Sequence, residues 1–304
     1  MNNHFLPEKS GYLNDEFRIF SLVSEKSQEF QTHYHSFHKL LFFESGAVSY
    51  YVEGETYELS PFDLVFVPAG EVHRPIIHSN APYRRLILYL SPAFFEKYEK
   101  KAVDLFHCFS LCSARTSHVL RFPDLPKSRL YPLLQELMHC AHRPLDPAEL
   151  LYQKSVLLQF LLLLNQAMSN GCPAFPSASV SSPQILQVIS YINQHLTDEL
   201  SIDQIASACF LHRSYLMHLF RQETGTTIGS YIAEKRLFTA RTLIRSGVSI
   251  TDAALQSGFP SYCAFYRAYQ KKYGHSPKDD RLSSRISSPY PSSSFGVSRQ
   301  NGLP

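Results

Sequence analysis

The sequence has 304 residues, of which 44% are hydrophobic and 18% are charged, a length and composition typical of a soluble protein with two domains. It contains no apolar run of the roughly 18 residues that a membrane-spanning helix requires. Its N-terminus lacks the basic-then-apolar pattern of a signal peptide. We therefore expect a cytoplasmic protein without a membrane partner.

Positive charge is concentrated in the C-terminal part of the chain. Residues 184–304 contain 13 Lys or Arg residues and 8 Asp or Glu residues, whereas residues 1–183 contain 16 and 18. A surface that binds nucleic-acid phosphates requires such a surplus. The distribution is consistent with a DNA-binding C-terminal domain.

The cysteines do not indicate disulfides or a zinc site. The six are Cys108, Cys112, Cys140, Cys172, Cys209 and Cys263, and they lack a paired spacing. A zinc site could be drawn from those at 108, 112 and 140 with His107, His118, His139 and His142, but their spacing matches no zinc-binding pattern. The spacing favours reduced, mostly buried thiols and imidazoles on helix surfaces.

The first third of the chain is predicted to form a small antiparallel β-structure. Short apolar runs at 40–43, 48–52, 56–59, 64–67 and 86–90 are separated by turn residues, among them Glu53-Gly54. We predict an antiparallel barrel or sandwich with a barrel-like interior. Aromatic residues such as Phe42, Tyr50 and Tyr57 are expected to line that interior.

Helices are predicted beyond Pro92, and the clearest runs from Ala148 to Met168 with a broad apolar face. The sequence from Ser169 to Pro183 lacks periodicity and contains three prolines, which is typical of a linker. The Ser-rich tail, residues 282–304, is predicted to be disordered. The fold class is therefore α+β, with a β-barrel domain and helical extension at 1–168, a linker at 169–183, and an all-α domain at 184–281.

The helical C-terminal domain contains an internal repeat of a helix-turn-helix unit. Ser201-Ile202 and Ala206 recur as Ser249-Ile250 and Ala254, 48 residues later in each case. In each copy the serine is placed to cap a helix, and the alanine is small enough for two helices to cross closely. A helix from Ile228 to Arg245 is predicted to join the two units rigidly.

The second helix of each unit is predicted to contact DNA. These helices are expected from about Arg213 to Glu223 and from about Ser261 to Tyr273. Two helix-turn-helix units on the basic side of the chain predict a protein that reads double-stranded DNA. The outward residues of these helices are Arg213, Ser214, Met217, His218 and Arg221 in the first helix-turn-helix unit, and Tyr262, Cys263, Ala264, Arg267 and Lys271 in the second helix-turn-helix unit.

The second helix-turn-helix unit resembles the signature of AraC-type regulators. The residues that carry the resemblance are Gly258-Phe259, Phe265, Arg267, Tyr269, Lys271-Lys272-Tyr273-Gly274, Ser276-Pro277 and Arg281. The likeness extends over about residues 184–281. The chain departs from the signature at Pro260, at Tyr269, where Phe is usual, and at Asp280, where an aromatic residue is common.

Four N-terminal residues are candidates for effector binding. His33, His35 and His73 resemble the histidine ligands of the two cupin motifs, while Lys39 occupies the position of the glutamate ligand. An ammonium group beside a divalent cation raises its energy, so we expect no metal and no other cofactor. The four residues are predicted to bind a sugar or small carboxylate; the alternative is that the histidines are strand residues at a wet barrel mouth.

The prediction is therefore a sequence-specific transcriptional regulator without catalytic residues, controlled by a small-molecule effector. Homodimers through the helix at 148–168 are expected, with RNA polymerase as a further candidate partner. One alternative is a cupin metalloenzyme with an accessory DNA-binding module. Another is a scaffold whose barrel binds a protein.

Overall fold

A computed structural model describes residues 13, 15–24, 30, 32–99, 103–114, 117–144, 146–171, 173–180 and 182–280. The chain forms two compact units. The first contains the described residues up to 194 together with 200–231, and the second contains 195–199 and 232–280. The tail at 282–304 and Cys172 lie outside the described residues. The predicted division into two domains around residues 169–183 stays a prediction.

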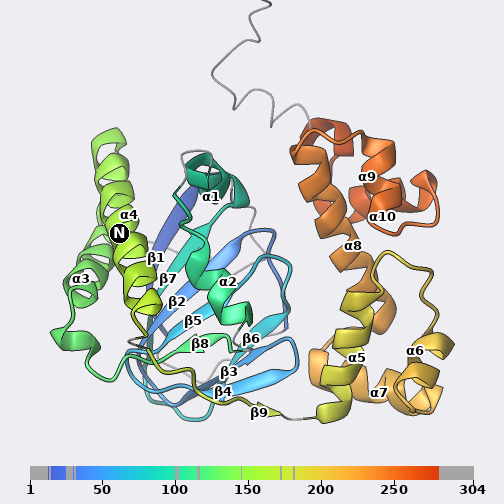
Figure 1. Ribbon diagram of the computed structural model, residues 1–304, viewed down its shortest axis with the longest axis horizontal. Coiled ribbons are helices and arrows are strands. Elements are labelled where there is room, and N and C mark those ends of the chain that lie inside the picture. Colours follow the sequence, from blue (N-terminus) through green and yellow to red (C-terminus); the bar gives the residue numbers. More distant parts are fainter. Residues whose placement is uncertain are drawn as a thin grey trace, which may run out of the picture. The chain divides into compact units, whose positions relative to one another are not determined.

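The strands of the first unit form two antiparallel sheets (Figure 1). Their bounds are β1 Phe17–Ser24, β2 His38–Ser45, β3 Val48–Val52, β4 Glu55–Glu58, β5 Leu64–Val67, β6 His73–Ile77, β7 Tyr83–Leu90, β8 Val119–Leu120 and β9 Ser179–Val180. One sheet has the order β1-β7-β2-β5-β8, and the other has the order β6-β3-β4-β9. All five predicted apolar runs coincide with strands. The one exception is Leu59, the last residue of its run, which follows the end of β4.

Alternation along the strands separates two apolar layers. In β2, Leu41 and Phe43 belong to the core between the sheets, whereas Leu40 and Phe42 pack on the helical side. The prediction that Phe42 lines the barrel interior is therefore wrong. Successive strand residues point to opposite faces, and the period of two places Phe42 on the other face from Phe43.

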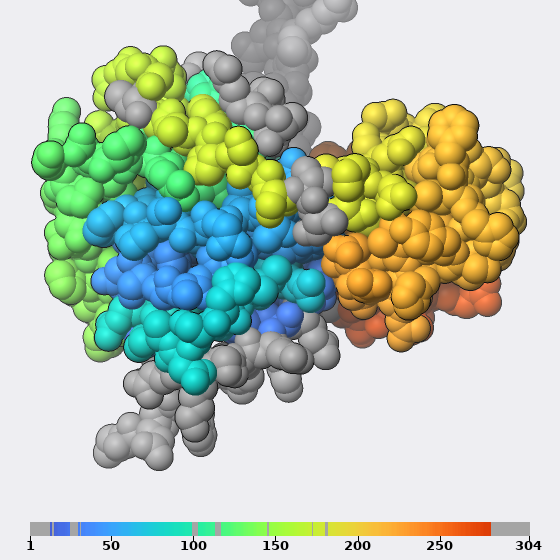
Figure 2. All heavy atoms as spheres, turned by 90° about the horizontal axis from the view of Figure 1, so that it is seen from below, coloured from blue at the N-terminus to red at the C-terminus, as the bar shows by residue number. Residues whose placement is uncertain are grey.

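Helices cover the outer face of the five-stranded sheet (Figure 1). They are α1 Pro92–Glu99, α2 His107–Ala114, the 3₁₀ turn η1 Leu125–Lys127, α3 Leu130–Cys140 and α4 Pro147–Ser169. In α4, Val156, Leu157, Phe160, Leu161 and Leu164 are buried in this layer. In Figure 2, strand residues coloured blue to cyan are visible at the surface, and no helix lies in front of them in this view.

The segment predicted as a linker carries a short strand. Within it, β9 pairs with β4 through Glu55 and Thr56, and Ala174 forms a β-bridge with Arg121. The Ser179 hydroxyl also donates a hydrogen bond to the Thr56 carbonyl oxygen at 3.0 Å. The chain between α4 and the next helix therefore contacts Arg121, directly after β8 of the first sheet, and then pairs with β4 of the second sheet.

Six helices follow the strand β9. They are α5 Pro183–Gln194, α6 Ile202–Ala208, α7 Arg213–Thr224, α8 Ile228–Arg245, α9 Ile250–Gln256 and α10 Tyr262–Tyr273. The predicted connector and both predicted recognition helices are confirmed to within about one residue. Figure 1 labels all six. The α5, α6 and α7 helices belong to the first unit, and α9 and α10 belong to the second.

Candidate functional site

The first helix-turn-helix motif consists of α6 and α7. The Ser201 side chain accepts a hydrogen bond from Gln204 N while the Gln204 side chain accepts one from Ser201 N, which is the predicted capping box. Ala206 is 4% exposed, as a close helix crossing requires. Leu216 and Phe220 hold the inner face of α7 and leave its other face to solvent.

The predicted DNA-contacting side chains of α7 lie on that solvent face. The exposed residues are Arg213, Ser214, Met217, His218 and Arg221. Arg213 forms an ion pair with Asp203 on α6, so this guanidinium has a protein partner without DNA. Tyr215 is also exposed, at 47%, and was not among the predicted contacts.

The second motif consists of α9 and α10, capped by Ser249 and Ser261. On α10 the residues Tyr262, Cys263, Arg267 and Lys271 are exposed and Ala264 is half-buried. The Arg267 Nε donates a hydrogen bond to the Cys263 carbonyl oxygen at 3.3 Å. Each motif thus presents a polar face from one helix of 12 residues.

The turns of the two motifs differ at equivalent positions. Phe210 lies 48 residues before Gly258, and both have positive φ angles, +55° and +86°. The Phe210 side chain is 92% exposed. A Cβ atom at Gly258 would lie 2.6 Å from the Leu196 carbonyl oxygen, so the second turn requires glycine. The sequence repeat did not reveal this difference, because the restriction comes from a distant carbonyl group.

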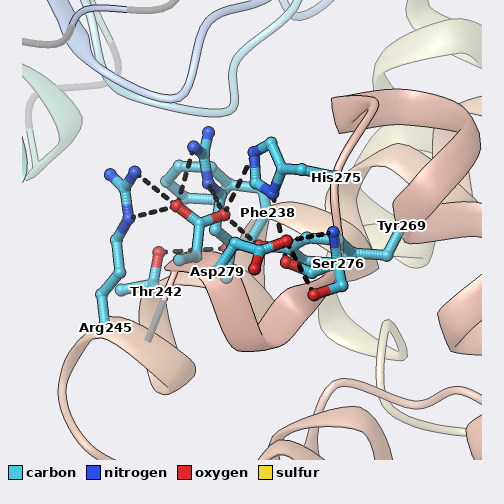
Figure 3. Close-up of polar contacts among 9 residues, drawn as sticks. Phe238, Thr242, Arg245, Tyr269, His275, Ser276 and Asp279 are labelled. Atoms are coloured by element: carbon cyan, nitrogen blue, oxygen red, sulfur yellow. Dashed lines mark hydrogen bonds and ion pairs between the residues drawn. The ribbon is translucent and has the colours of Figure 1, made fainter. Parts of the chain in front are cut away.

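A buried carboxylate connects α8, α10 and the segment after α10 (Figure 3). Asp280, which is 4% exposed, accepts a hydrogen bond from Arg241 Nε at 2.9 Å and another from the Tyr269 hydroxyl. Arg245 Nη2 adds a third contact at 2.8 Å. Tyr269 and Asp280 are both departures from the family signature, and here they are hydrogen-bonded partners.

The four predicted effector-binding residues are brought together at one end of the barrel interior. One ring nitrogen each of His33, His35 and His73 lies within 4.8 Å of the others. His33 and His73 are paired by two backbone hydrogen bonds. Lys39 is 1% exposed, and its Nζ lies 5.8 Å from the centre of the Tyr50 ring and 6.0 Å from that of Tyr89. We call His33, His35, Lys39 and His73 the histidine–lysine cluster.

Two rings of the cluster are kept neutral. Burial, together with the positive charge of Lys39, holds the pKa values of His35 and His73 well below the usual value for histidine. Sequence reasoning did not predict the contributions of Tyr89, of Phe37, which stacks on His35 at 4.5 Å, or of Glu71. The Glu71 carbonyl oxygen accepts a hydrogen bond from His73 Nδ1 at 3.0 Å.

The cluster only partly fits the metal site of the cupins. Its three imidazoles are suitable donors, and the carbonyl partner of His73 is of the kind that orients a metal ligand. No aspartate or glutamate among the described residues joins the group, however, and a protonated lysine does not coordinate a cation. The donor set is therefore three neutral imidazoles beside an ammonium group, and it does not form a closed metal cage.

The described cysteines form no comparable donor group. Cys108, Cys112, Cys140 and Cys209 are buried and Cys263 is exposed, all as free thiols. Burial raises the pKa of the Cys112 thiol to about 12 and acts in the same direction on Cys108. Such thiols remain protonated at neutral pH.

Glu53 makes contacts that sequence reasoning did not identify. It has φ +47° and precedes Gly54, with φ +96°, as in the hairpin turns that require two positive φ angles. Its Oε1 accepts a hydrogen bond from Val72 N at 2.7 Å, and its Oε2 accepts one from the Tyr231 hydroxyl at 2.6 Å. All these residues belong to the first unit, and Val72 directly precedes His73.

Comparison with known proteins gives matches in both parts of the chain. Residues 22–161 match the family described as the AraC-like ligand binding domain, and residues 194–283 match the one described as a helix-turn-helix domain. Among the described residues, no helix is both long and apolar enough to cross a membrane.

Three curated relatives illustrate the extent of the similarity. The chain is 34% identical over 104 residues to the xylose operon regulatory protein of Escherichia coli K12, a segment covering 34% of this chain and 26% of that protein. It is 33% identical over 104 residues to the regulatory protein SoxS of Salmonella typhimurium, covering 34% of this chain and 97% of SoxS. It is 24% identical over 254 residues to the transcriptional activator RhaS of Shigella sonnei, covering 83% of this chain and 88% of RhaS.

Proposed function

Because the chain belongs to the AraC family of DNA-binding transcriptional regulators and is not an enzyme, we propose that it is a dimeric, effector-controlled regulator that reads DNA with α7 and α10. The observation that carries the DNA-binding part is the pair of capped motifs whose second helices leave polar faces to solvent. The RhaS relative is named as an activator, and we extend that direction of regulation to this chain. The family assignment leaves the metalloenzyme alternative without support.

The histidine–lysine cluster is proposed as the effector site. A positive charge that is 1% exposed beside neutral imidazoles favours an uncharged or anionic molecule that offers hydrogen-bonding oxygen atoms. The strand-residue alternative would leave buried ring nitrogens without hydrogen bonds, and such groups destabilise a fold. The burial of the cluster therefore supports the effector role.

Glu53 is the proposed link from the effector site to the first motif. His73 and Val72 are consecutive, and Val72 is hydrogen-bonded to Glu53 in both directions, through its N–H and its carbonyl oxygen. The other carboxylate oxygen of Glu53 accepts from Tyr231 in the first turns of α8, which directly follows α7. An effector that displaces His73 would therefore act on the hydrogen bond to Tyr231.

Dimerisation is proposed through α4, but through another face than the sequence indicated. Leu157 and Leu161 are fully buried within the first unit and are not available to a partner. Leu151 and Leu162, at 69% and 49% exposure, lie 11 residues apart and thus on one side of the helix. These exposed leucines support a two-fold helix–helix contact.

The proposal is tested by selecting DNA from a random pool with the full chain and measuring its affinity for the selected site while small molecules are added. We expect one selected sequence and at least one molecule that changes the affinity. An unselective protein, or a selective one whose affinity no small molecule alters, would contradict the DNA-reading or the effector-control part respectively. An Arg143→Ala variant, altered at an exposed arginine far from both motifs in sequence, is the control.

A further inference from the structure

The hydrogen bond to Glu71 fixes which nitrogen of His73 carries a hydrogen atom. A carbonyl oxygen can only accept, so His73 Nδ1 is the donor in this 3.0 Å contact. The ring is neutral, since burial and the charge of Lys39 lower its pKa. Nε2 therefore carries a lone pair and acts as an acceptor.

That acceptor is buried, and its ring packs against His33 and His35, with ring centres 4.5 and 5.0 Å away. The His73 ring is 0% exposed, and its Nε2 has no hydrogen-bond partner among the residues that the structure describes. One nitrogen of the same ring lies within 4.8 Å of a ring nitrogen of His33 and of His35. A buried acceptor of this kind is satisfied by a ligand that brings a hydrogen-bond donor.

His35 and Lys39 add hydrogen-bond donors to the cluster. Neither ring nitrogen of His35 has a hydrogen-bond partner among the described residues, and its neutral ring carries one donor and one acceptor. The Lys39 ammonium group, between the rings of Tyr50 and Tyr89, can only donate. The cluster thus combines a positive donor with an acceptor on His73.

These groups exclude several simple ligands. A fully ionised anion complements the charge of Lys39 but offers no hydrogen to His73 Nε2. A divalent metal ion satisfies Nε2 but meets the like charge of Lys39 in a buried site. A small molecule with both a carboxylate and a hydroxyl group satisfies both residues.

We propose that the histidine–lysine cluster recognises a small hydroxycarboxylate, whose carboxylate faces Lys39 and whose hydroxyl group donates a hydrogen bond to His73 Nε2. This assignment rests on the proposed effector role of the cluster and names the chemical class of the effector. His35 supplies one further hydrogen bond to the carboxylate or to the hydroxyl oxygen.

The test measures binding of hydroxycarboxylates to the full chain by calorimetry. The panel runs from glycolate and lactate to gluconate, and each acid is paired with its counterpart that lacks the hydroxyl group next to the carboxylate and with its uncharged amide. We expect at least one hydroxycarboxylate to bind about tenfold or more tightly than both of its counterparts. Equal binding of the amide, or no binding by any member of the panel at millimolar concentration, would overturn the assignment.

Variants separate the two contacts. Lys39→Met should abolish the preference for the acid over its amide, and His73→Leu should abolish the preference for the hydroxylated acid over its deoxy counterpart. Lys39→Glu should weaken binding of the acid further, because it reverses the charge. His78→Gln, at a half-exposed histidine of the same barrel, is the matched control and should bind like the wild type. Melting curves identify any variant that does not fold.

Metal analysis completes the experiment. A stoichiometric divalent metal in the purified wild type would overturn the assignment, whereas Lys39→Glu, which supplies a carboxylate, is the variant expected to gain metal affinity. The selected DNA site is titrated in parallel. If another class of molecule changes DNA affinity, only the hydroxycarboxylate assignment fails; if no molecule does, effector control itself fails.

Discussion

The hydroxyl group of Tyr231 donates a hydrogen bond of 2.6 Å to Glu53 Oε2, across 178 residues of sequence. Glu53 lies in the β3–β4 turn, and Tyr231 lies in α8 directly after the first helix-turn-helix motif. The second oxygen of the same carboxylate is bonded to Val72, the neighbour of His73. One side chain therefore contacts both the residue before His73, a member of the histidine–lysine cluster, and the helix that follows α7.

Replacing Tyr231 by phenylalanine tests this link. Tyr231→Phe removes a buried hydroxyl group that donates to the half-buried Glu53 carboxylate, so we expect about 1–3 kcal/mol less stability and a reduced effect of the effector on DNA affinity. Tyr152→Phe, which removes an exposed hydroxyl group on α4, is the control. An unchanged effector response in Tyr231→Phe would show that the signal does not pass through this contact.

The contact between Tyr269 and Asp280 predicts that the second unit becomes less stable to unfolding at low pH. Burial alone would raise the pKa of Asp280, but the hydrogen bonds and charge of Arg241, with Tyr269 and Arg245, lower it to about 2. A lowered pKa contributes stability above the ordinary value near 4, and this contribution is lost as the pH falls toward 2. We expect a loss of about 2 kcal/mol over that range, measured by urea unfolding.

Asp280→Asn should remove most of this pH dependence, and Tyr269→Phe should remove part of it. In a double-mutant cycle the two changes should be non-additive, because they share one hydrogen bond. Additive effects would show that the two departures from the family signature are energetically independent.

Arg267 is the predicted base-reading residue of α10. Arg267→Ala should reduce DNA affinity by about 1–3 kcal/mol and relax selectivity at one base pair, since arginine can form two hydrogen bonds with guanine. His218 and Ser214 are the corresponding residues of α7. Uniform weakening on all sequences, measured by selection from a random pool, would assign Arg267 to a phosphate contact instead.

Aspartates introduced on the two faces of α4 should have different effects on dimerisation and folding. Leu151→Asp with Leu162→Asp should produce folded monomers, because both side chains are exposed in the protomer. Leu157→Asp with Leu161→Asp should unfold the first unit, because both are fully buried. Sedimentation analysis with circular dichroism distinguishes these outcomes, and dimers that survive the first pair of changes would exclude this face.

Local patterns predicted most elements, while long-range contacts were beyond them. The caps at Ser201 and Ser249 and the helix of α8 follow from neighbouring residues, so the sequence was sufficient. The strands β1 and β6 were not predicted: both are edge strands, and β6 contains Pro75. At the site, motif spacing grouped the three histidines with Lys39, but Tyr89, which packs against the cluster, and Tyr231, which bonds to Glu53, come from distant segments that only the fold brings close.

A hydroxyl-radical footprint of the full chain on its selected site shows whether α7 and α10 read DNA together. For each protomer we expect two protected segments on one face of the duplex, about 34 Å apart, one for each recognition helix in successive major grooves. His218→Ala should remove contacts in one segment and Arg267→Ala in the other. A single protected segment for each protomer, or the loss of the same contacts in both variants, would contradict joint reading of DNA by α7 and α10.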